Sequence, residues 1–246
     1  MGDISNRSKT CFPDACCITD HFHVIQELTR RVDRVRIRVQ NRFRNTVNTL
    51  KPKKNNKTIT PEELIELEEA SRYYYVLKKF NWLLASTNKK ILDVNVERRF
   101  NHRLNRYLNY SEILAYMLAI DDELEEAFYL RNDVTYFYDH CTYDTAKKQL
   151  EKIITDFRSS TVAEMSPFAN TLTNWKKEII NSFIIVDDKA NRKMNTAIVE
   201  NRNKSIKLLK HASNGYLNWE RFRNRILYTL NEDTTFYYTS IRKDGK

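Results

Sequence analysis

The sequence predicts a mainly α-helical fold. Only three glycines and four prolines occur among 246 residues, and a β-rich chain of that length would need more residues suited to tight turns. Apolar residues recur at spacings of three and four in several segments, which is the period of an amphipathic helix. Composition and periodicity together favour helices over strands.

The first predicted elements are a short strand and a long basic helix. Residues 14–20, DACCITD, are an apolar run closed by Asp20, which is typical of a buried strand with a carboxylate at its end. From His21 the period becomes helical and predicts one helix of roughly 25–30 residues. Its apolar face holds Val24, Leu28, Val32, Val35, Val39 and Phe43, and its other face holds Arg30, Arg31, Arg34, Arg38, Arg42 and Arg44.

Helix-capping and helix-breaking residues divide the rest of the chain into further helices. The cationic, proline-broken segment KPKKNNK at residues 51–57 predicts an exposed loop. Thr60-Pro61-Glu62-Glu63 predicts a helix start with a capping box, and this helix is expected to reach about Ser86. Later helices are predicted over 94–108, from Ser111 to Tyr138, from Thr142 or Asp144 to Phe157, from Ser166, from Asn195 or Thr196 to Asn214-Gly215, and over 219–230 after a cap at Asn218.

The charge balance predicts a polyanionic partner. The chain has 42 Lys and Arg against 32 Asp and Glu, a formal charge of 42 − 32 = +10. Nucleic acid is the simplest partner for this surplus, and a basic protein without such a partner is the alternative. The four cysteines, Cys11, Cys16, Cys17 and Cys141, form no disulfide framework. With no signal peptide and no apolar run of membrane-spanning length, we expect a cytoplasmic protein without membrane contact.

Two acidic residues stand apart from the charge runs that usually mark solvated helix faces. Asp20 ends the predicted strand, where a rigid element would hold it as a metal ligand must be held. From the residues alone, an N-cap for the helix that starts at His21 is the favoured role of Asp20. Glu200 lies among amides and cations, which suits either a metal-binding acid beside phosphate-binding groups or an ion pair with Lys204.

A zinc site is the less favoured interpretation of the first block. Cys16, Cys17, His21 and His23 lie close together, but their spacing fits no closed four-ligand pattern. A strand would also point the two cysteines to opposite faces. We therefore do not expect zinc here.

Two separated blocks of the sequence carry a family resemblance. The first, residues 12–43, begins FPDACCITDHFHVIQ and contains a P-x-A block followed by D-x-F-H and an apolar residue. The second, residues 195–227, reads NTAIVENRNKSIKLLKHASNGYLNWERFRNRIL, in which an Asn-rich turn leads to Glu, Ile-Lys and a Gly-aromatic-x-Asn segment. Both blocks resemble the ISL3 family of DDE insertion-sequence transposases, in the same order. The stretch between them matches only in helical character and length.

This resemblance implies a ribonuclease-H-like core in which two Asp and one Glu hold two divalent ions, Mg²⁺ or Mn²⁺, for DNA cleavage and strand transfer. Asp20 matches the second Asp, and Glu200 matches the Glu. The implied partner is DNA at the insertion-sequence ends, and a second copy of the chain is a further candidate partner. The candidate DNA-binding residues are Arg30, Arg31, Arg34, Arg38, Asn203, Lys204, Lys207 and Lys210.

The implied fold is mainly α, the C-terminal part of a ribonuclease-H-like α/β core with few strands, interrupted by a large helical insertion. Residues 1–50 would form the partial core with its long basic helix. Residues 51–190 would form the helical insertion, and residues 191–246 would supply the catalytic-Glu helix and the final helix that complete the core.

The chain departs from the family near its beginning. Ungapped counting places the family's first Asp just before Met1, and the family's N-terminal zinc-binding and helix-turn-helix region has no counterpart. Asp3 lies nearby, but its use would need a shortened helix. We therefore expect a truncated transposase that is inactive alone, because two carboxylates make a poorer two-metal site than three. The alternatives are a non-catalytic, basic helical protein that binds nucleic acid, and a helical interaction protein with an aromatic core or partner surface.

Overall fold

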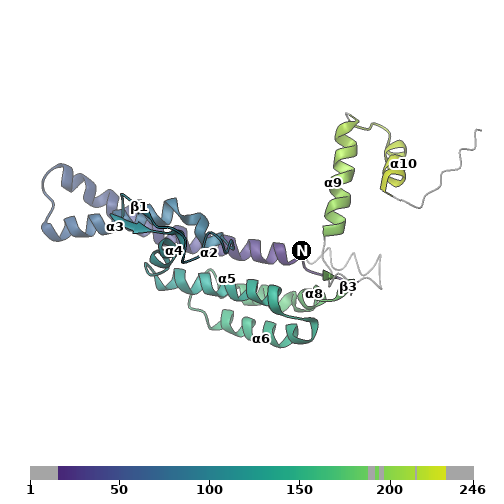
Figure 1. Cartoon of the computed structure of the whole chain (residues 1–246), viewed down its shortest axis with the longest axis horizontal. Helices are drawn as coiled ribbons and strands as arrows, with labels where there is room; N and C mark the ends of the chain where they lie inside the picture. Colours follow the sequence, from purple (N-terminus) through teal and green to yellow (C-terminus); the bar gives the residue numbers. More distant parts are fainter. Residues whose placement is uncertain (1–15, 188–191, 194–196, 214, 231–246) are drawn as a thin grey trace, which may run out of the picture. The chain divides into compact units, whose positions relative to one another are not determined.

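The structure is a computed structural model that describes residues 16–187, 192–193, 197–213 and 215–230 (Figure 1). These residues are mainly helical, as predicted, and the strands among them form two small antiparallel pairs. Of the helices described, none is both long and apolar enough to cross a bilayer. The chain divides into two compact units, residues 1–194 and residues 195–246, and each is described by itself.

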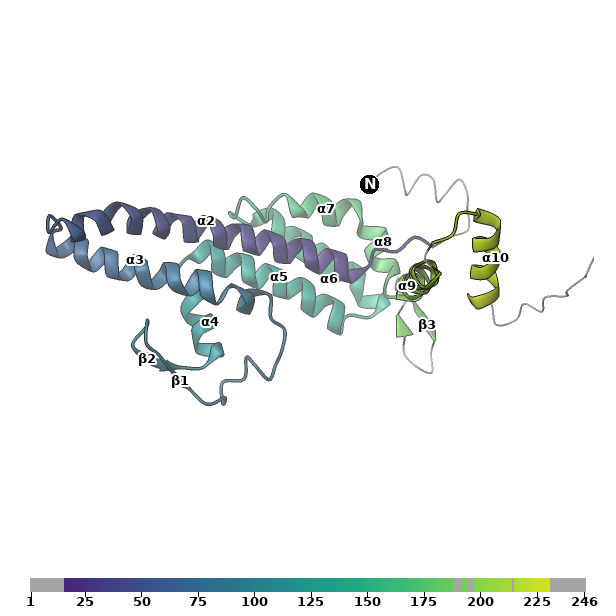
Figure 2. The same ribbon diagram turned by 90° about the horizontal axis from the view of Figure 1, so that it is seen from above.

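Helix α2, His21–Asn55, confirms the helix predicted after Asp20. Its apolar stripe packs against α3 (Pro61–Lys79) and α5 (Asp122–His140), which lie beside α2 in Figures 1 and 2. Burying one Val or Leu side chain contributes roughly 1.5–3 kcal/mol, and the buried residues of this stripe include Val24, Leu28, Val32, Val35 and Val39.

The loop predicted over residues 51–57 is wrong for most of its length, because α2 continues through Pro52 to Asn55. Proline has no N–H group and therefore removes one hydrogen bond from a helix. Pro52 lies in the last turn of α2, where little helix remains to be supported beyond it. Proline alone was therefore too weak a signal to end the helix.

A Schellman motif ends α2 a few residues later. The N–H of Lys57 donates to the Lys54 carbonyl at 3.2 Å, and the N–H of Thr58 donates to the Lys53 carbonyl at 3.0 Å. Lys57 has a φ of 56°, the left-handed conformation in which glycine is usually found. A lysine side chain thus occupies a position that favours glycine.

Helix α3 begins with the capping box that the sequence predicts. The Thr60 hydroxyl accepts the Glu63 N–H at 3.2 Å, and the Glu63 carboxylate accepts the Thr60 N–H at 3.1 Å. The helix ends at Lys79, short of the predicted Ser86, and is followed by the 3-10 helix η1, Asn81–Ala85. Helix α3 runs back along α2 as the second arm of a helical hairpin (Figure 2).

The prediction of a helix over residues 94–108 is wrong. The segment contains an antiparallel hairpin of β1 (Arg99–Asn101) and β2 (Arg106–Leu108). The Asn101 side-chain oxygen accepts two backbone N–H groups of the connecting turn, both at 3.1 Å, and Asn105 has a φ of 51°. Asparagine side chains that bind the local backbone in this way compete with helix formation.

The single helix predicted from Ser111 to Tyr138 is two helices, α4 (Tyr110–Leu118) and α5. Asp121 marks the break, because its carboxylate caps α5 by accepting the Leu124 N–H at 3.1 Å. The break allows α5 to lie along α2 while α4 takes another direction (Figure 2).

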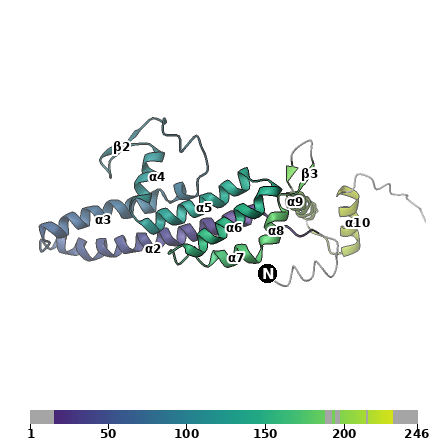
Figure 3. The same ribbon diagram turned by 90° about the horizontal axis from the view of Figure 1, so that it is seen from below.

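Three shorter helices complete the helical part of the first unit. Helix α6 (Tyr143–Ser159) has Thr142 as its N-cap, as predicted, and lies beside α5 (Figure 3). The next predicted helix is divided at Trp175 into α7 (Phe168–Asn174) and α8 (Lys176–Asn181). Both contact α6, so the aromatic and aliphatic residues of this region join one core with α2 and α5.

A small sheet follows α8. Strand β3 (Ile185–Asp187) pairs antiparallel with β4 (Arg192–Lys193). The Lys193 ammonium donates to the carbonyls of Tyr138 at 2.9 Å and Cys141 at 3.1 Å, at the C-terminal end of α5. A cation is stabilised at this end of a helix by the helix dipole, and the contact ties the sheet to α5.

The second unit contains α9 (Ala197–Ala212) and α10 (Trp219–Leu230). Gly215 has a φ of 93°, as expected for a left-handed residue after α9. The Asn218 side chain accepts the Arg221 N–H at 3.1 Å, which confirms the predicted cap of α10. The cap residues predicted for α9 lie outside the described residues.

Arginines on α2 bind carboxylates of neighbouring segments. Arg38 donates to both oxygens of Glu164, at 2.9 and 3.1 Å, and also pairs with Glu123. Arg42 pairs with Asp121. These bonds raise the pKa of Arg38 and lower that of Glu164. They link α2 to the start of α5 and to the segment before α7.

The left-handed lysine gives a first prediction. We expect Lys57→Gly to stabilise the protein by about 1 kcal/mol, because glycine has no Cβ to crowd a left-handed backbone. Lys57→Ala is the matched control, since it removes the same charge but keeps the Cβ. Urea unfolding measures both variants, and a Lys57→Gly protein no more stable than Lys57→Ala would contradict the argument.

The Arg38–Glu164 pair predicts a loss of stability in acid. Folding lowers the pKa of Glu164 below its ordinary 4.5, chiefly through the hydrogen bond from Arg38. The stabilisation is therefore complete above that ordinary pKa and is lost as the pH falls through the lowered one. Calorimetry between about pH 5 and pH 3 should show a steeper fall in Tm for the wild type than for Glu164→Gln. An equal fall of Tm with pH in the two proteins would exclude the Arg38–Glu164 pair as a cause of the loss of stability in acid.

Candidate functional site

Asp20 lies immediately before α2 and caps it. Its Oδ1 accepts the Phe22 N–H at 2.8 Å, which confirms the capping role that the residues alone favoured. The strand predicted before it is wrong for residues 16–20, which have no regular secondary structure. Residues 14 and 15 of the predicted strand lie outside the described ranges.

The segment before Asp20 is hydrogen-bonded to a helix and not to a neighbouring strand. The Thr19 N–H donates to the Glu178 carbonyl at 3.1 Å, and the Asn181 side chain donates to the Cys17 carbonyl at 2.9 Å. Both partners lie on α8. Because these backbone groups are satisfied by a helix, the residues before Asp20 are held in place without a sheet.

The Asp20 side chain is only 10% exposed and lies against aromatic residues. His21 Nδ1 is 3.5 Å from Asp20 Oδ1, and the His21 ring is 5.7 Å from the ring of Tyr138 on α5. Burial raises the pKa of the Tyr138 hydroxyl, and the nearby Asp20 carboxylate raises it further. Within the described residues this hydroxyl is buried and has no hydrogen-bond partner. Tyr138 therefore keeps its proton.

Tyr138 is a residue near Asp20 that sequence reasoning missed. Tyr138 stacks on Phe183 with ring centroids 5.7 Å apart, and the Lys193 ammonium lies 4.5 Å from the same Phe183 ring. No spacing in the sequence connects Tyr138 to Asp20, because only the packing of α5 against α2 brings Tyr138 to its neighbourhood.

Glu200 lies in the first turn of α9 and is exposed. A carboxylate is favoured there by the helix dipole. Within the described residues Glu200 forms no ion pair with Lys204, so that alternative is not supported. The candidate DNA-binding residues on the same helix are also exposed: Asn203, Lys204, Lys207 and Lys210.

The candidate arginines on α2 have unequal surroundings. Arg30 is exposed and lies 3.8 Å from Glu27, and Arg34 is also exposed. Arg31 donates to the Glu164 carbonyl at 2.6 Å, and Arg38 binds the Glu164 carboxylate. Arg31 and Arg38 therefore already stabilise the fold, whether or not they also meet DNA.

The two candidate metal ligands belong to different units, Asp20 to the first and Glu200 to the second. Their pairing in one site stays a prediction. Within the described parts of the chain, no three or more His, Cys, Asp or Glu side chains come together as a metal-binding group, and this holds also for the cysteines and histidines around residue 20. Asp3 lies outside the described residues.

Comparison with known proteins identifies the family. The model of the DDE transposase family ISL3, described as a transposase, matches residues 4–226 and so includes both Asp20 and Glu200. No curated protein matches the chain, and no solved structure does. The family match covers most of the 246 residues, and we conclude that the chain belongs to the ISL3 family of DDE transposases.

Proposed function

We propose that the chain acts in metal-dependent DNA cleavage and strand transfer during insertion-sequence transposition, with Asp20 and Glu200 as two of the metal-binding carboxylates. The observation that carries this proposal is the family match, which spans both residues. DNA at the ends of the insertion sequence is the proposed substrate. The net charge of +10 supports a polyanionic substrate of this kind.

The two acids suit hard divalent ions such as Mg²⁺ or Mn²⁺, because carboxylate oxygens are the ligands that these ions prefer. The bond to the Phe22 N–H holds Asp20 Oδ1 in one orientation at 2.8 Å. A carboxylate has two oxygens and about four acceptor positions, so capping and metal binding are compatible. When bound, a metal pair activates the attacking oxygen and stabilises the leaving oxygen of a phosphoryl displacement.

The chain's own residues have separate tasks in this proposal. The burial of the Asp20 side chain, which is 10% exposed, limits water around it. The exposed cations that follow Glu200 on α9 would hold the phosphates of the strand that reacts. Asp20 and α9 would belong to a ribonuclease-H-like core, and residues 51–190 would be an insertion in that core.

The family resemblance assigns two carboxylates of this chain, Asp20 and Glu200, and two carboxylates make a poorer two-metal site than three. We propose that the chain binds DNA but does not cleave it alone. Non-catalytic nucleic-acid binding is the second candidate function, and the specific observation that favours it is a groove on α2 and α3 whose lining includes six cations and one carboxylate.

Two substitutions at Asp20 separate its capping role from its metal-binding role. Asparagine caps a helix as well as aspartate does, whereas alanine costs about 1 kcal/mol. We expect Asp20→Ala to lower Tm by about 2–4 °C and Asp20→Asn to leave it nearly unchanged. Both variants should lose Mn²⁺ binding, measured from the electron paramagnetic resonance signal of the free ion.

Asp144→Asn is the matched control for the metal measurement, because Asp144 is an exposed acid in the first turn of α6. It should retain the Mn²⁺ binding of the wild type. Equal Mn²⁺ binding by the wild type and Asp20→Asn would remove Asp20 from the proposed site. An unchanged Tm for Asp20→Ala would contradict its role as a cap.

A plasmid assay tests the proposed reaction. The purified chain is incubated with supercoiled DNA in Mg²⁺ or Mn²⁺, beside Asp20→Asn and Glu200→Gln proteins. We expect salt-sensitive binding without nicking. Nicking that both variants abolish would confirm the two carboxylates and overturn the proposed inactivity. Nicking that neither variant changes would exclude both residues, and no DNA binding at moderate salt would overturn a function directed at DNA.

A further inference from the structure

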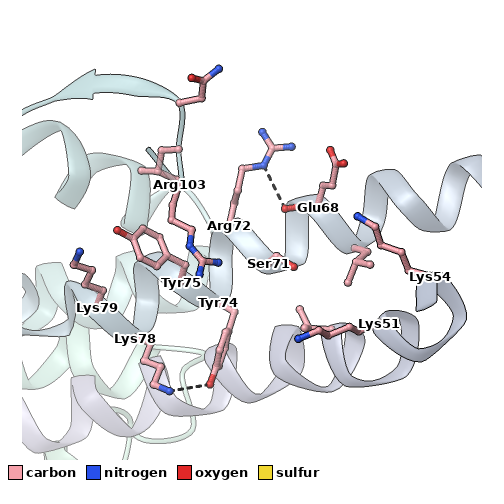
Figure 4. Close-up of a pocket in the computed structure, with 14 residues that line it drawn as sticks. Lys51, Lys54, Glu68, Ser71, Arg72, Tyr74, Tyr75, Lys78, Lys79 and Arg103 are labelled. Carbon is pink, nitrogen blue, oxygen red and sulfur yellow. Dashed lines mark hydrogen bonds between the residues drawn. The ribbon is translucent and has the colours of Figure 1, made fainter. Parts of the chain in front are cut away.

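A basic groove lies on the helical hairpin of α2 and α3, away from Asp20. It has a volume of about 950 Å³ and is bounded by the end of α2, by α3 and by the turn between β1 and β2 (Figure 4). One carboxylate, Glu68, is among its lining residues. Six cations line it: Lys51, Lys54, Arg72, Lys78, Lys79 and Arg103.

The cations of this basic groove differ from the arginines in the middle of α2. Arg38 and Arg42 bind carboxylates, as does Lys53 beside the groove. Within the described part of the chain, none of the six groove cations forms an ion pair with a carboxylate. Their positive charge is therefore available to a partner from outside, whereas the charge on Arg38 and Arg42 is largely compensated.

Two tyrosines help to position these cations without neutralising them. The Lys78 ammonium donates to the Tyr74 hydroxyl at 3.3 Å. The Lys79 ammonium is 5.4 Å and the Arg103 guanidinium 5.6 Å from the centre of the Tyr75 ring. An aromatic face attracts a cation but leaves its full charge in place. In Figure 4, Tyr75 and Arg103 lie together at one end of the groove.

We propose that the basic groove binds the sugar–phosphate backbone of DNA, which deepens the proposed function and rests on it for the identity of the polyanion. The cations come from three separate segments, so they suit an extended chain of phosphates better than a single anion. Lysine and arginine contacts of this kind position a nucleic acid without reading its sequence. The groove is thus a second DNA contact, distinct from the carboxylates and from the cations of α9.

Neutralising three groove cations tests the proposal. The variant Lys78→Gln, Lys79→Gln, Arg103→Gln is compared with the wild type by fluorescence anisotropy of a labelled duplex of about 30 base pairs and the matching single strand, in EDTA. We expect binding to weaken at least tenfold at about 0.1 M salt. The slope of log K against log salt should become shallower by about 2–3, because each phosphate that the protein neutralises contributes about 0.9 to that slope.

The matched control is the variant Lys147→Gln, Lys148→Gln, Lys152→Gln, which removes the same charge from exposed positions on α6. It should bind DNA within about twofold of the wild type, and thermal unfolding confirms that both triple variants fold. The proposal is overturned if the groove variant binds DNA as the wild type does, or if both triple variants lose affinity equally. It is also overturned if polyglutamate binds the groove more tightly than DNA.

The outcome is separable from that of the proposed function, because EDTA removes any contribution of bound metal. A protein carrying both Asp20→Asn and Glu200→Gln should keep the groove-dependent affinity. Loss of affinity in the groove variant supports the groove even if Asp20 proves not to bind Mn²⁺. Conversely, metal binding by Asp20 together with an unaffected groove variant would leave the proposed function standing and overturn the groove.

Discussion

The first unit depends on the burial of one apolar stripe along α2. Leu28, Val32, Val35 and Val39 are almost completely inaccessible, and they meet α3 on one side and α5 on the other. At roughly 1.5–3 kcal/mol for each buried side chain, these four residues contribute more to the stability of the fold than any single ion pair on the surface of the helix. They also position both ends of α2, one beside Asp20 and the other beside the basic groove.

Arginine residues on the same helix show why charge in a sequence is a weak guide to a binding surface. Arg36 is buried and donates to the Leu77 carbonyl at 3.1 Å, which joins α2 to α3. Arg38 and Arg42 meet acids of other segments. Three arginines of the row that suggests a nucleic-acid surface, Arg31, Arg38 and Arg42, thus bind other segments of the fold. The cations of the basic groove lie where the sequence predicts a loop and two helices.

Local signals were readable from the sequence, and contacts between distant segments were not. The capping pairs at Thr60 and Asn218 need only neighbouring residues, and the structure confirms both. The helix predicted over 94–108 fails because asparagine turns override a helical composition. Asp20 was recognisable as a cap, but Tyr138 reaches it only through the packing of α5, which no local pattern encodes.

The length of α2 separates two proposed DNA contacts, Asp20 at the start of the helix and the basic groove towards its end. Arg36, which donates to the Leu77 carbonyl beside Lys78 and Lys79, is 36 − 20 = 16 residues of helix from Asp20, or about 24 Å at 1.5 Å per residue. Lys51, at the other end of the groove, is about 45 Å from Asp20 by the same measure. A duplex rises about 3.4 Å per base pair, so the groove begins about 7 base pairs from Asp20 and ends about 13 base pairs from it. Phosphates in the basic groove are therefore too far from Asp20 to take part in its chemistry. Binding there would act on affinity and orientation, because a distant contact that is equal in the ground and transition states lowers KM without raising kcat.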